Sequence, residues 1–305
     1  MRILVTGASG HFGGTAARRL LERMPARDLI LMSRKPERLT EFAAAGCEIR
    51  YGDFDDPASL EAAARGADKM LLISGLKVGW RVAQHGNAID AARRAGVGHI
   101  VYTSYIGATA ENPAMVTIDH YGTEQLLKAS GIAWTAMRDG MYMESMIEAA
   151  APAALKTGKW VSASGGGRNS FVDRSECVDC AVEVLLTQGH ENRVYNVTGT
   201  ELLSFPDLAA MVSEIAGKPI EYVELDEAAL YAHFDAMGIP RDPLVEFNID
   251  GYAWCSNDIV SYERGLRGGH FEVTSNDIRL LLGRDPKPFR AFAEERADWL
   301  RSIAG

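Results

Sequence analysis

Short apolar runs alternate with longer stretches of amphipathic sequence throughout the first half of the chain. Continuous apolar runs are typical of strands that are covered on both faces of a sheet. Apolar residues spaced three or four apart are typical of helices with one buried face. We therefore predict strands at residues 3–5, 29–32, 48–51, 69–73, 99–103 and 132–137. The predicted helices between them span residues 13–24, 38–45, 59–64, 82–95 and 119–129.

This alternation predicts an α/β fold built on a doubly wound parallel sheet of about six or seven strands. The second half of the chain is less regular. There we predict a strand at residues 194–197 and helices at residues 177–186, 205–216, 226–237, 278–282 and 289–303. We expect one domain over residues 1–150. Residues 151–305 should form mainly a small α/β lobe, with some segments returning to the first domain.

The first predicted strand runs directly into a glycine-rich segment that opens the first helix. Gly7 permits a tight turn, Gly10 lets the backbone approach a pyrophosphate, and Gly13 allows the helix to pack closely on the strand. The helix N-terminus supplies free N–H groups for the phosphates. This context predicts a Rossmann-type dinucleotide site, and the alternative is a glycine-rich turn without a ligand. The predicted contacts are Thr6, Gly7, Ser9, Gly10, His11, Phe12 and Gly13.

The end of the second predicted strand carries Ser33, Arg34 and Lys35. Sites that prefer NAD usually place Asp or Glu here, where the carboxylate accepts a hydrogen bond from the ribose 2′-hydroxyl. Arg34 can instead bind a 2′-phosphate through two hydrogen bonds, with added charge from Lys35 and a hydroxyl donor from Ser33. We therefore predict NADP(H) as the cofactor. The alternative is a solvated basic loop.

Other cofactor contacts are expected after the following strands, because ligands of such sheets bind at the carboxyl ends of the strands. Asp53 is equally suited to an adenine contact and to a turn or helix cap. The predicted contacts are Asp53 and Phe54 at the adenine, Ser74 and Gly75 along the cofactor, and Thr103 and Ser104 beside the nicotinamide.

Charge and composition narrow the class of partner. The chain of 305 residues has 41 acidic and 32 basic side chains, a formal net charge of -9. This balance argues against non-specific nucleic-acid binding and, more weakly, against an anionic membrane surface. No apolar run approaches the roughly 20 residues of a transmembrane helix, and the N-terminal run is too short for a signal peptide. We expect a cytoplasmic protein with a small-molecule partner.

The four cysteines are too sparse for a disulfide scaffold. Cys177 and Cys180 form a CxxC pair, but it lies within a predicted helix. Structural zinc requires four ligands, and the pattern supplies two. We therefore predict two buried helical thiols and no metal site.

Several further segments, together with the glycine motif, resemble the NmrA-like atypical short-chain dehydrogenase/reductases. The similarity is greatest to the branch of bacterial type 2 NAD(P)H:quinone oxidoreductases and triphenylmethane reductases. It covers the first half of the chain well and the C-terminal part more loosely. The segments that carry it are residues 6–13, 67–74, 84–85, 87–92, 102–104, 120–124, 130–135 and 138–142.

The resemblance implies a Rossmann domain with a small C-terminal substrate lobe and NADPH-dependent reduction of quinones or other conjugated aromatic acceptors. A benzylic-ether or imine reductase is a more specialised alternative. The family also contains regulators that bind dinucleotides without turnover, so a non-catalytic NADP(H) sensor is the second hypothesis. The resemblance does not decide whether the chain forms a homodimer.

The Tyr-x-x-x-Lys pair of ordinary short-chain dehydrogenases is missing, since Tyr121 is followed four residues later by Gln125. Instead, His120 and Glu124 stand four apart on one helix face. The resemblance places His120 where some reductases have a lysine. We predict His120 as a proton donor, with Glu124 holding its ring or raising its pKa. The alternative is a surface His–Glu pair.

The acceptor pocket is expected from residues that follow the fifth and sixth strands. Their adaptable apolar groups suit flat aromatic substrates. Asp139 stands where relatives often have Asn, whereas for Trp80 and His85 a structural role is favoured. The alternative for the pocket residues is ordinary core packing. The predicted substrate contacts are Tyr105, Asp139, Met141, Tyr142 and Met143.

Overall fold

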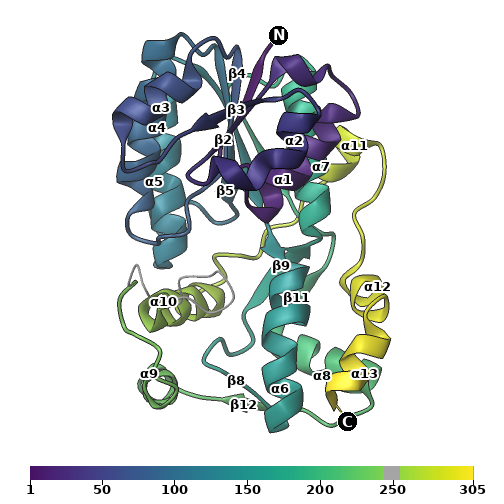
Figure 1. The fold of residues 1–305 in the computed structure, drawn as a ribbon. Coiled ribbons are helices and arrows are strands. Elements are labelled where there is room, and N and C mark those ends of the chain that lie inside the picture. Colours follow the sequence, from purple (N-terminus) through teal and green to yellow (C-terminus); the bar gives the residue numbers. More distant parts are fainter. Residues whose placement is uncertain (244–254, 305) are drawn as a thin grey trace.

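The computed structural model describes residues 1–243 and 255–304. Within them, a sheet of seven parallel strands has the order β10-β6-β5-β4-β1-β2-β3 (Figure 1). This confirms the predicted doubly wound sheet. Its order reverses between β1 and β4, the switch point beside which such folds bind ligands. The strands are β1 (Ile3–Val5), β2 (Leu29–Ser33), β3 (Glu48–Tyr51), β4 (Lys69–Leu72), β5 (His99–Tyr105), β6 (Ala133–Asp139) and β10 (Arg193–Val197).

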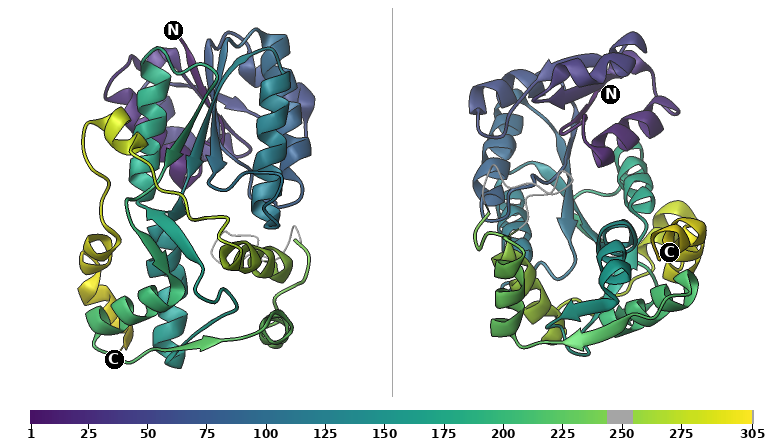
Figure 2. Two further views of the ribbon diagram at one scale, coloured as in Figure 1. Left: turned by 180° about the vertical axis from the view of Figure 1, so that it is seen from behind. Right: turned by 60° about the horizontal axis from the view of Figure 1, so that its bottom comes forward.

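Helices cover both faces of this sheet, as Figures 1 and 2 show. One layer contains α3 (Pro57–Ala64), α4 (Arg81–Ala95) and α5 (Met115–Ala129). The other contains α1 (His11–Leu21), α7 (Arg174–Leu186) and α11 (Asp277–Leu282). Short helical segments η1 (Ala26–Asp28), η2 (Pro36–Leu39) and α2 (Thr40–Ala44) flank the outer strands β2 and β3.

The central strands are apolar at successive positions because both of their faces are buried. Ile3 and Val5 pack in one core with Leu20 of α1 and Cys180 of α7. Leu4, which lies between them in β1, packs in the opposite core with Ala88 of α4. The predicted strand pattern therefore reflects two cores, one on each side of the sheet.

The remaining described elements form the lower part of Figure 1, around a separate aromatic core that includes Phe171, Phe205 and Phe289. Two small sheets have the orders β11-β9-β7 and β12-β8. Their strands are β7 (Met141–Tyr142), β8 (Lys159–Ser162), β9 (Arg168–Val172), β11 (Leu202–Ser204) and β12 (Glu221–Glu224). The helices are π-helix η3 (Ser145–Ala150), α6 (Ala151–Thr157), α8 (Phe205–Ala216), α9 (Glu227–Ala236), α10 (Ser256–Arg267), α12 (Phe289–Glu294) and α13 (Ala297–Ala304).

Several element boundaries differ from the prediction, and those of β5 and β6 affect the site. β5 extends to Tyr105 and β6 to Asp139, because these polar ends pair with each other in register, as Tyr105 does with Asp139. α5 begins at Met115, before the predicted start. The predicted helix over residues 289–303 is two helices, α12 and α13.

The four cysteines are free and buried, and Cys177 and Cys180 lie within α7, as predicted. Across residues 1–243 and 255–304, we find no group of three or more His, Cys, Asp or Glu side chains arranged to hold a metal ion. No helix in the same ranges has the length and apolarity that crossing a bilayer requires.

Candidate functional site

The glycine-rich turn between β1 and α1 has the geometry of a phosphate-binding loop. Gly7 has φ +58°, which favours glycine. A Cβ on Gly13 would lie 2.5 Å from the carbonyl oxygen of Gly7, so a larger residue would push α1 off the loop. α1 begins at His11, and no side chain caps its N-terminal N–H groups. The turn therefore leaves the N–H groups and dipole of α1 free for an anion.

The end of β2 lies against this turn and is followed directly by the basic residues Arg34 and Lys35. The hydroxyls of Ser9 and Ser33 are 2.7 Å apart, and Ser33 Oγ also accepts a hydrogen bond of 2.9 Å from the backbone N–H of Lys35. The side chains of Arg34 and Lys35 are exposed, with no ion pair in the described part of the chain. A 2′-phosphate of NADP(H) fits this group of hydroxyl and cationic donors.

Several predicted cofactor contacts have side chains that are used within the protein. Thr6 Oγ1 donates to the carbonyl of Leu71 and accepts from the N–H of Ile73, which ties the turn to β4. Thr103 Oγ1 accepts a hydrogen bond of 2.9 Å from the N–H of Ser74. These side chains position the strand ends, and their direct contact with the cofactor stays a prediction.

The loop after β3 is anchored in a similar way. Asp53 Oδ1 accepts from the N–H of Asp55 at 3.1 Å, so its carboxylate forms the turn that was the alternative to an adenine contact. The ring of Phe54 lies edge-on to the ring of His85, with centroids 5.8 Å apart. His85 is fully buried, and its Nε2 accepts from the N–H of Gly75 at 3.0 Å. Its structural role agrees with the favoured interpretation, whereas Trp80 is half exposed on the surface.

A chain of buried hydrogen bonds sets the protonation of His120. The N–H of Gly75 donates to His85 Nε2, so a neutral His85 carries its proton on Nδ1 and donates it to Thr123 Oγ1 at 2.9 Å. The hydroxyl of Tyr102 lies 3.4 Å from this Nδ1 and 2.7 Å from Nδ1 of His120. With Tyr102 as the donor to Nδ1, a neutral His120 has its proton on Nε2.

Both histidines of this chain are neutral near pH 7. Burial, with a smaller effect from the nearby Arg81 guanidinium, lowers the pKa of His85 to about 3. Burial, followed by the charges of Arg81 and His85, holds the pKa of His120 well below its usual range. His120 can therefore donate a hydrogen bond from Nε2–H, but it holds no extra proton to transfer.

Glu124 does not support His120, and this part of the sequence prediction is wrong. Its carboxylate is fully buried and binds the guanidinium of Arg138 through two hydrogen bonds of 2.8 and 2.7 Å, with a third of 2.7 Å from Ser104 Oγ. A buried carboxylate requires a compensating cation, and a neutral imidazole supplies none. The alternative of a surface pair is also wrong, because both side chains are buried.

Tyr105, an expected acceptor contact, meets residues that the sequence did not indicate. The ring of Tyr105 stacks near His120, with centroids 6.0 Å apart. Its hydroxyl donates to Tyr262 of α10 at 3.3 Å, and Tyr262 also accepts from Asn169 of β9 at 2.5 Å. Tyr262 lies 157 residues from Tyr105 in sequence, and no local motif marked it.

The methionines of the predicted pocket have different surroundings. Met141 is half-buried, and its Sδ lies 3.7 Å from the hydroxyl of Tyr105. Met143 is 1% exposed and packs in the aromatic core of the smaller part of the fold. For Met143 the structure supports the alternative, core packing.

Asp139 is buried at the end of β6, where its carboxylate meets Tyr142 and α7. The hydroxyl of Tyr142 donates to Oδ2 at 2.9 Å, and Oδ1 is buried without a hydrogen-bond partner. Burial raises the pKa of Asp139 to about 7, and the nearby Tyr142 hydroxyl and Cys177 thiol oppose this rise. The side chain thus supports Tyr142, and any direct contact with a substrate stays a prediction.

This raised pKa predicts how stability depends on pH. The folded protein binds the Asp139 proton more tightly than the unfolded chain, so stability is lost as the pH rises from about 4 to about 7. Asp139→Asn removes the ionisation and keeps a hydrogen-bond acceptor for Tyr142. We expect the wild type to lose about 2–3 kcal/mol more than the variant between about pH 5 and pH 8.

Urea unfolding at the two pH values measures this difference. Asp298→Asn, at an exposed carboxylate, is the control and should follow the wild type. Parallel losses of stability in the wild type and Asp139→Asn would contradict the assignment.

Comparison with known proteins places these features in a family. Residues 7–174 match the NAD(P)H-binding family. Quinone oxidoreductase 2 of Escherichia coli is 37% identical over 281 residues, which cover 92% of this chain and 93% of that protein.

Solved structures agree over nearly the whole chain. An Escherichia coli NADPH-dependent quinone oxidoreductase complexed with NADPH has a TM-score of 0.86 and 32% identity, covering 98% of this chain and 99% of that one. Triphenylmethane reductase from Citrobacter sp. complexed with NADP(H) has a TM-score of 0.84 and 29% identity, covering 97% and 99%. Because both the family match and these relatives extend over more than half of its length, the chain belongs to the NAD(P)H-binding family, in the NmrA-like reductase branch that its motifs resemble.

Proposed function

We propose that the protein is an NADPH-dependent oxidoreductase that reduces quinone-like or other conjugated aromatic acceptors. The observation that carries this proposal is the 2.7 Å hydrogen bond between the Tyr102 hydroxyl and His120 Nδ1. With Tyr102 as its donor, this bond leaves His120 an Nε2–H for an acceptor oxygen. Membership of the NAD(P)H-binding family and the reductase names of its relatives support the same conclusion.

Two groups of residues bind different parts of the cofactor. Ser33, Arg34 and Lys35 hold the 2′-phosphate, and the N-terminus of α1 holds the pyrophosphate. This places the adenosine half beside β2, so the nicotinamide half extends past β4 toward β5 and β6. The bound cofactor supplies a hydride to the acceptor.

His120 stabilises the acceptor oxygen as negative charge develops on it. A neutral imidazole with its proton on Nε2 is a hydrogen-bond donor that requires no change of charge before the reaction. Tyr102 keeps this tautomer, because burial raises the pKa of its hydroxyl and the phenol therefore keeps its proton. Water then protonates the reduced acceptor.

The smaller part of the fold supplies the other side of the acceptor site. Tyr262 of α10 contacts the hydroxyl of Tyr105, beside the thioether of Met141, and Asn169 of β9 donates to Tyr262. Flat aromatic acceptors suit this combination of rings and a flexible thioether. We accordingly propose that residues after 150 act mainly as the substrate lobe, while α7 and β10 return to the nucleotide-binding sheet.

His120→Ala tests the proposed chemistry. We expect kcat for quinone reduction to fall about 10–100-fold, since one donor to the developing oxyanion is lost, with the Kd for NADPH within about twofold. Tyr102→Phe should give a smaller loss, and Tyr121→Phe on the same helix should leave kcat unchanged. Because His120 stays neutral, His120→Ala should leave the shape of the kcat–pH profile between about pH 6 and pH 9 unchanged. Full activity of His120→Ala, or an ionisation in the wild-type profile that this variant removes, would refute this role.

A further inference from the structure

A cation and a carboxylate that the proposed reaction does not use lie close to the stack of Tyr105 on His120. Arg81, the first residue of α4, donates from Nε to the carbonyl of Gly75 at 2.6 Å. Its Nη1 is buried and has no hydrogen-bond partner among residues 1–243 and 255–304. Oδ1 of Asp258 in α10 is also buried without a partner in these two ranges. A buried donor and a buried acceptor without partners are both costly, so their positions indicate that a further polar group joins them.

Arg81 lies beside His120. The N–H of Gly79 donates to Oδ2 of Asp119 at 2.6 Å, which ties the turn before Arg81 to α5. Asp119 directly precedes His120 in this helix. Gly75, which accepts from Arg81, also starts the hydrogen-bond chain that ends at His120. Burial and then the Arg81 charge lower the pKa of His120, so the guanidinium lies on the His120 side of the proposed acceptor site.

Asp258 approaches the same stack from α10. It precedes Tyr262 by one helical turn, so the two side chains lie on one face of the helix, and the hydroxyl of Tyr262 contacts that of Tyr105. Burial, and to a smaller extent the carboxylate of Asp258, raise the pKa of Tyr105. The start of α10 is tied to the start of α5, since the N–H of Met115 donates to Ser261 Oγ at 3.0 Å. Asp258 is therefore held close to Tyr105 and to the first turn of α5.

The charges of Arg81 and Asp258 influence each other although the two unpartnered atoms do not bond. Burial raises the pKa of Asp258 to about 6, and the charge of Arg81 opposes this rise. Asp119, which is 3% exposed, is also close enough for its charge to raise the pKa of Asp258. These three side chains thus form one cluster, with two carboxyl groups for one guanidinium.

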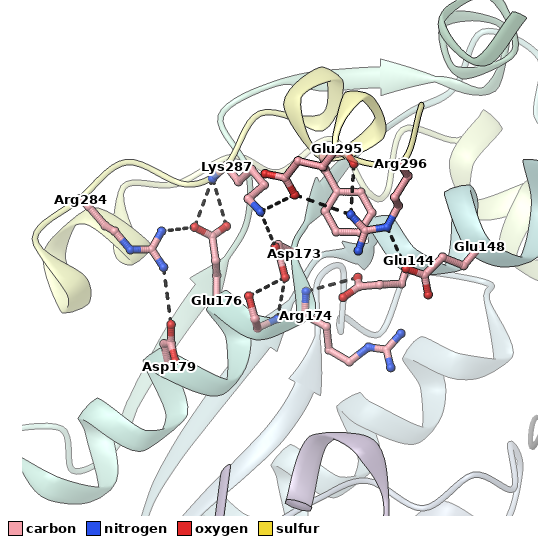
Figure 3. Close-up of polar contacts among 12 residues, drawn as sticks. Glu144, Glu148, Asp173, Arg174, Glu176, Asp179, Arg284, Lys287, Glu295 and Arg296 are labelled. Atoms are coloured by element: carbon pink, nitrogen blue, oxygen red, sulfur yellow. Dashed lines mark hydrogen bonds and ion pairs between the residues drawn. The ribbon is translucent and has the colours of Figure 1, made fainter. Parts of the chain in front are cut away.

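Buried carboxylates elsewhere in the fold have cations bonded to them, as Figure 3 shows for the network between α7 and the C-terminal segment. Glu176, which is 2% exposed, pairs with Arg284 and accepts 3.1 Å hydrogen bonds from the backbone N–H of Lys287. Both oxygens of Glu176 are therefore used. Oδ1 of Asp258, which has no partner in the described part of the chain, departs from this pattern. An unused acceptor near an unused donor is typical of a binding site.

The chemistry of the two unpartnered atoms limits which group can satisfy both. A guanidinium donates and a carboxylate accepts, so the bridging group must accept one hydrogen bond and donate another. A hydroxyl does both. A carboxylate or sulfonate group has no proton to donate and would be repelled by the two carboxylates, whereas an ammonium group cannot accept.

We propose that Arg81 and Asp258 bind a hydroxyl group of the acceptor, which accepts from Arg81 Nη1 and donates to Asp258 Oδ1 while His120 donates to the acceptor's carbonyl oxygen. The inference rests on the proposed reduction of quinone-like acceptors and narrows the preferred class to neutral quinones with a hydroxyl-bearing substituent. It makes Arg81 and Asp258 residues that determine specificity, without a part in hydride transfer.

Binding of two matched quinones tests this assignment. Menadione carries a methyl group on its quinone ring, and its hydroxymethyl analogue carries a hydroxymethyl group at the same position. The protein is saturated with NADP⁺, which has no hydride to give, so equilibrium binding is measured without turnover. We expect the wild type to bind the hydroxymethyl analogue about tenfold or more tightly than menadione, because hydrogen bonds to charged groups are strong.

Variants of the pair should remove this preference. Asp258→Leu and Arg81→Met should bring the two Kd values to within about twofold of each other, with the Kd for menadione little changed. Asp258→Asn keeps an oxygen acceptor without the charge and should give an intermediate ratio. Arg264→Gln, at an exposed cation of α10 that pairs with Glu227, is the matched control and should keep the wild-type ratio.

Retained affinity for menadione also shows that a variant folds. Equal binding of both quinones by the wild type, or a preference that survives Asp258→Leu and Arg81→Met, would overturn the proposal. Equal weakening of both quinones in the variants would assign the pair a structural role and also overturn it. NADPH oxidation by menadione tests the reductase function separately. No oxidation, together with a hydroxyl preference that the variants remove, would refute the reductase function and leave the hydroxyl site supported.

Discussion

Replacing Arg34 with Asp will weaken NADPH binding by roughly 10²–10³-fold, because a charge-assisted pair is lost and a like charge is added beside the 2′-phosphate. Arg34 is exposed at the end of β2, next to the Ser9–Ser33 hydroxyl pair. An Asp at this position can accept a hydrogen bond from the ribose 2′-hydroxyl, so the affinity for NADH should be kept or improved. Titration with both cofactors measures the ratio of the two Kd values.

Arg27→Asp is the control for this change of charge. Arg27 is an exposed residue of η1, just before β2 and thus at the opposite end of the strand from Arg34. It should leave the ratio of the two Kd values unchanged. If Arg34→Asp also leaves the ratio unchanged, Arg34 belongs to a solvated basic loop and the predicted preference for NADP(H) loses its basis.

The second large expected effect is a loss of stability when the ion pair between Glu124 and Arg138 is broken. Arg138→Met leaves the carboxylate of Glu124, which is fully buried, with Ser104 as its remaining partner. Removing one partner of such a pair typically costs about 3–5 kcal/mol of unfolding free energy. Glu124→Gln should cost less, since Arg138 is partly exposed and its guanidinium can reach water. Urea unfolding of both variants and of the double variant measures the difference.

Arg18→Gln is the control for the stability measurements, because both members of the Arg18–Glu41 pair are exposed. Surface pairs contribute about 0–1 kcal/mol. A loss of stability in Arg138→Met that is no larger than in Arg18→Gln would contradict the role given to this pair. A double variant that is more stable than Arg138→Met alone would support it.

The features that could be predicted from sequence are those that depend on residues adjacent in the chain. The apolar runs of β1, β2 and β4 are buried on both faces, so local composition was sufficient to identify them. The turn around Gly7 and Gly13 depends on steric limits that only glycine meets, and these limits are visible in one segment. The sheet and its switch point follow from the order of these elements.

The features that sequence did not indicate depend on groups that meet only in the folded chain. Helix spacing is a local rule that pairs Glu124 with His120, whereas the partner of Glu124 in the structure, Arg138, comes from a different element, β6. Tyr262 and Asn169 belong to the irregular half, where no periodicity marks a residue as part of a site. The protonation of His120 depends on Tyr102 and His85, which were assigned no part in the chemistry.

Hydride transfer from NADPH to a quinone-like acceptor can be measured in an anaerobic single-turnover experiment. The protein loaded with equimolar NADPH is mixed with a panel of quinones and conjugated dyes, and both NADPH and the reduced acceptor are quantified. We expect loss of NADPH with at least one acceptor, and one reduced acceptor for each NADPH oxidised. Tight NADPH binding with no oxidation by any acceptor would contradict the proposed reductase activity and favour a non-catalytic sensor of NADP(H).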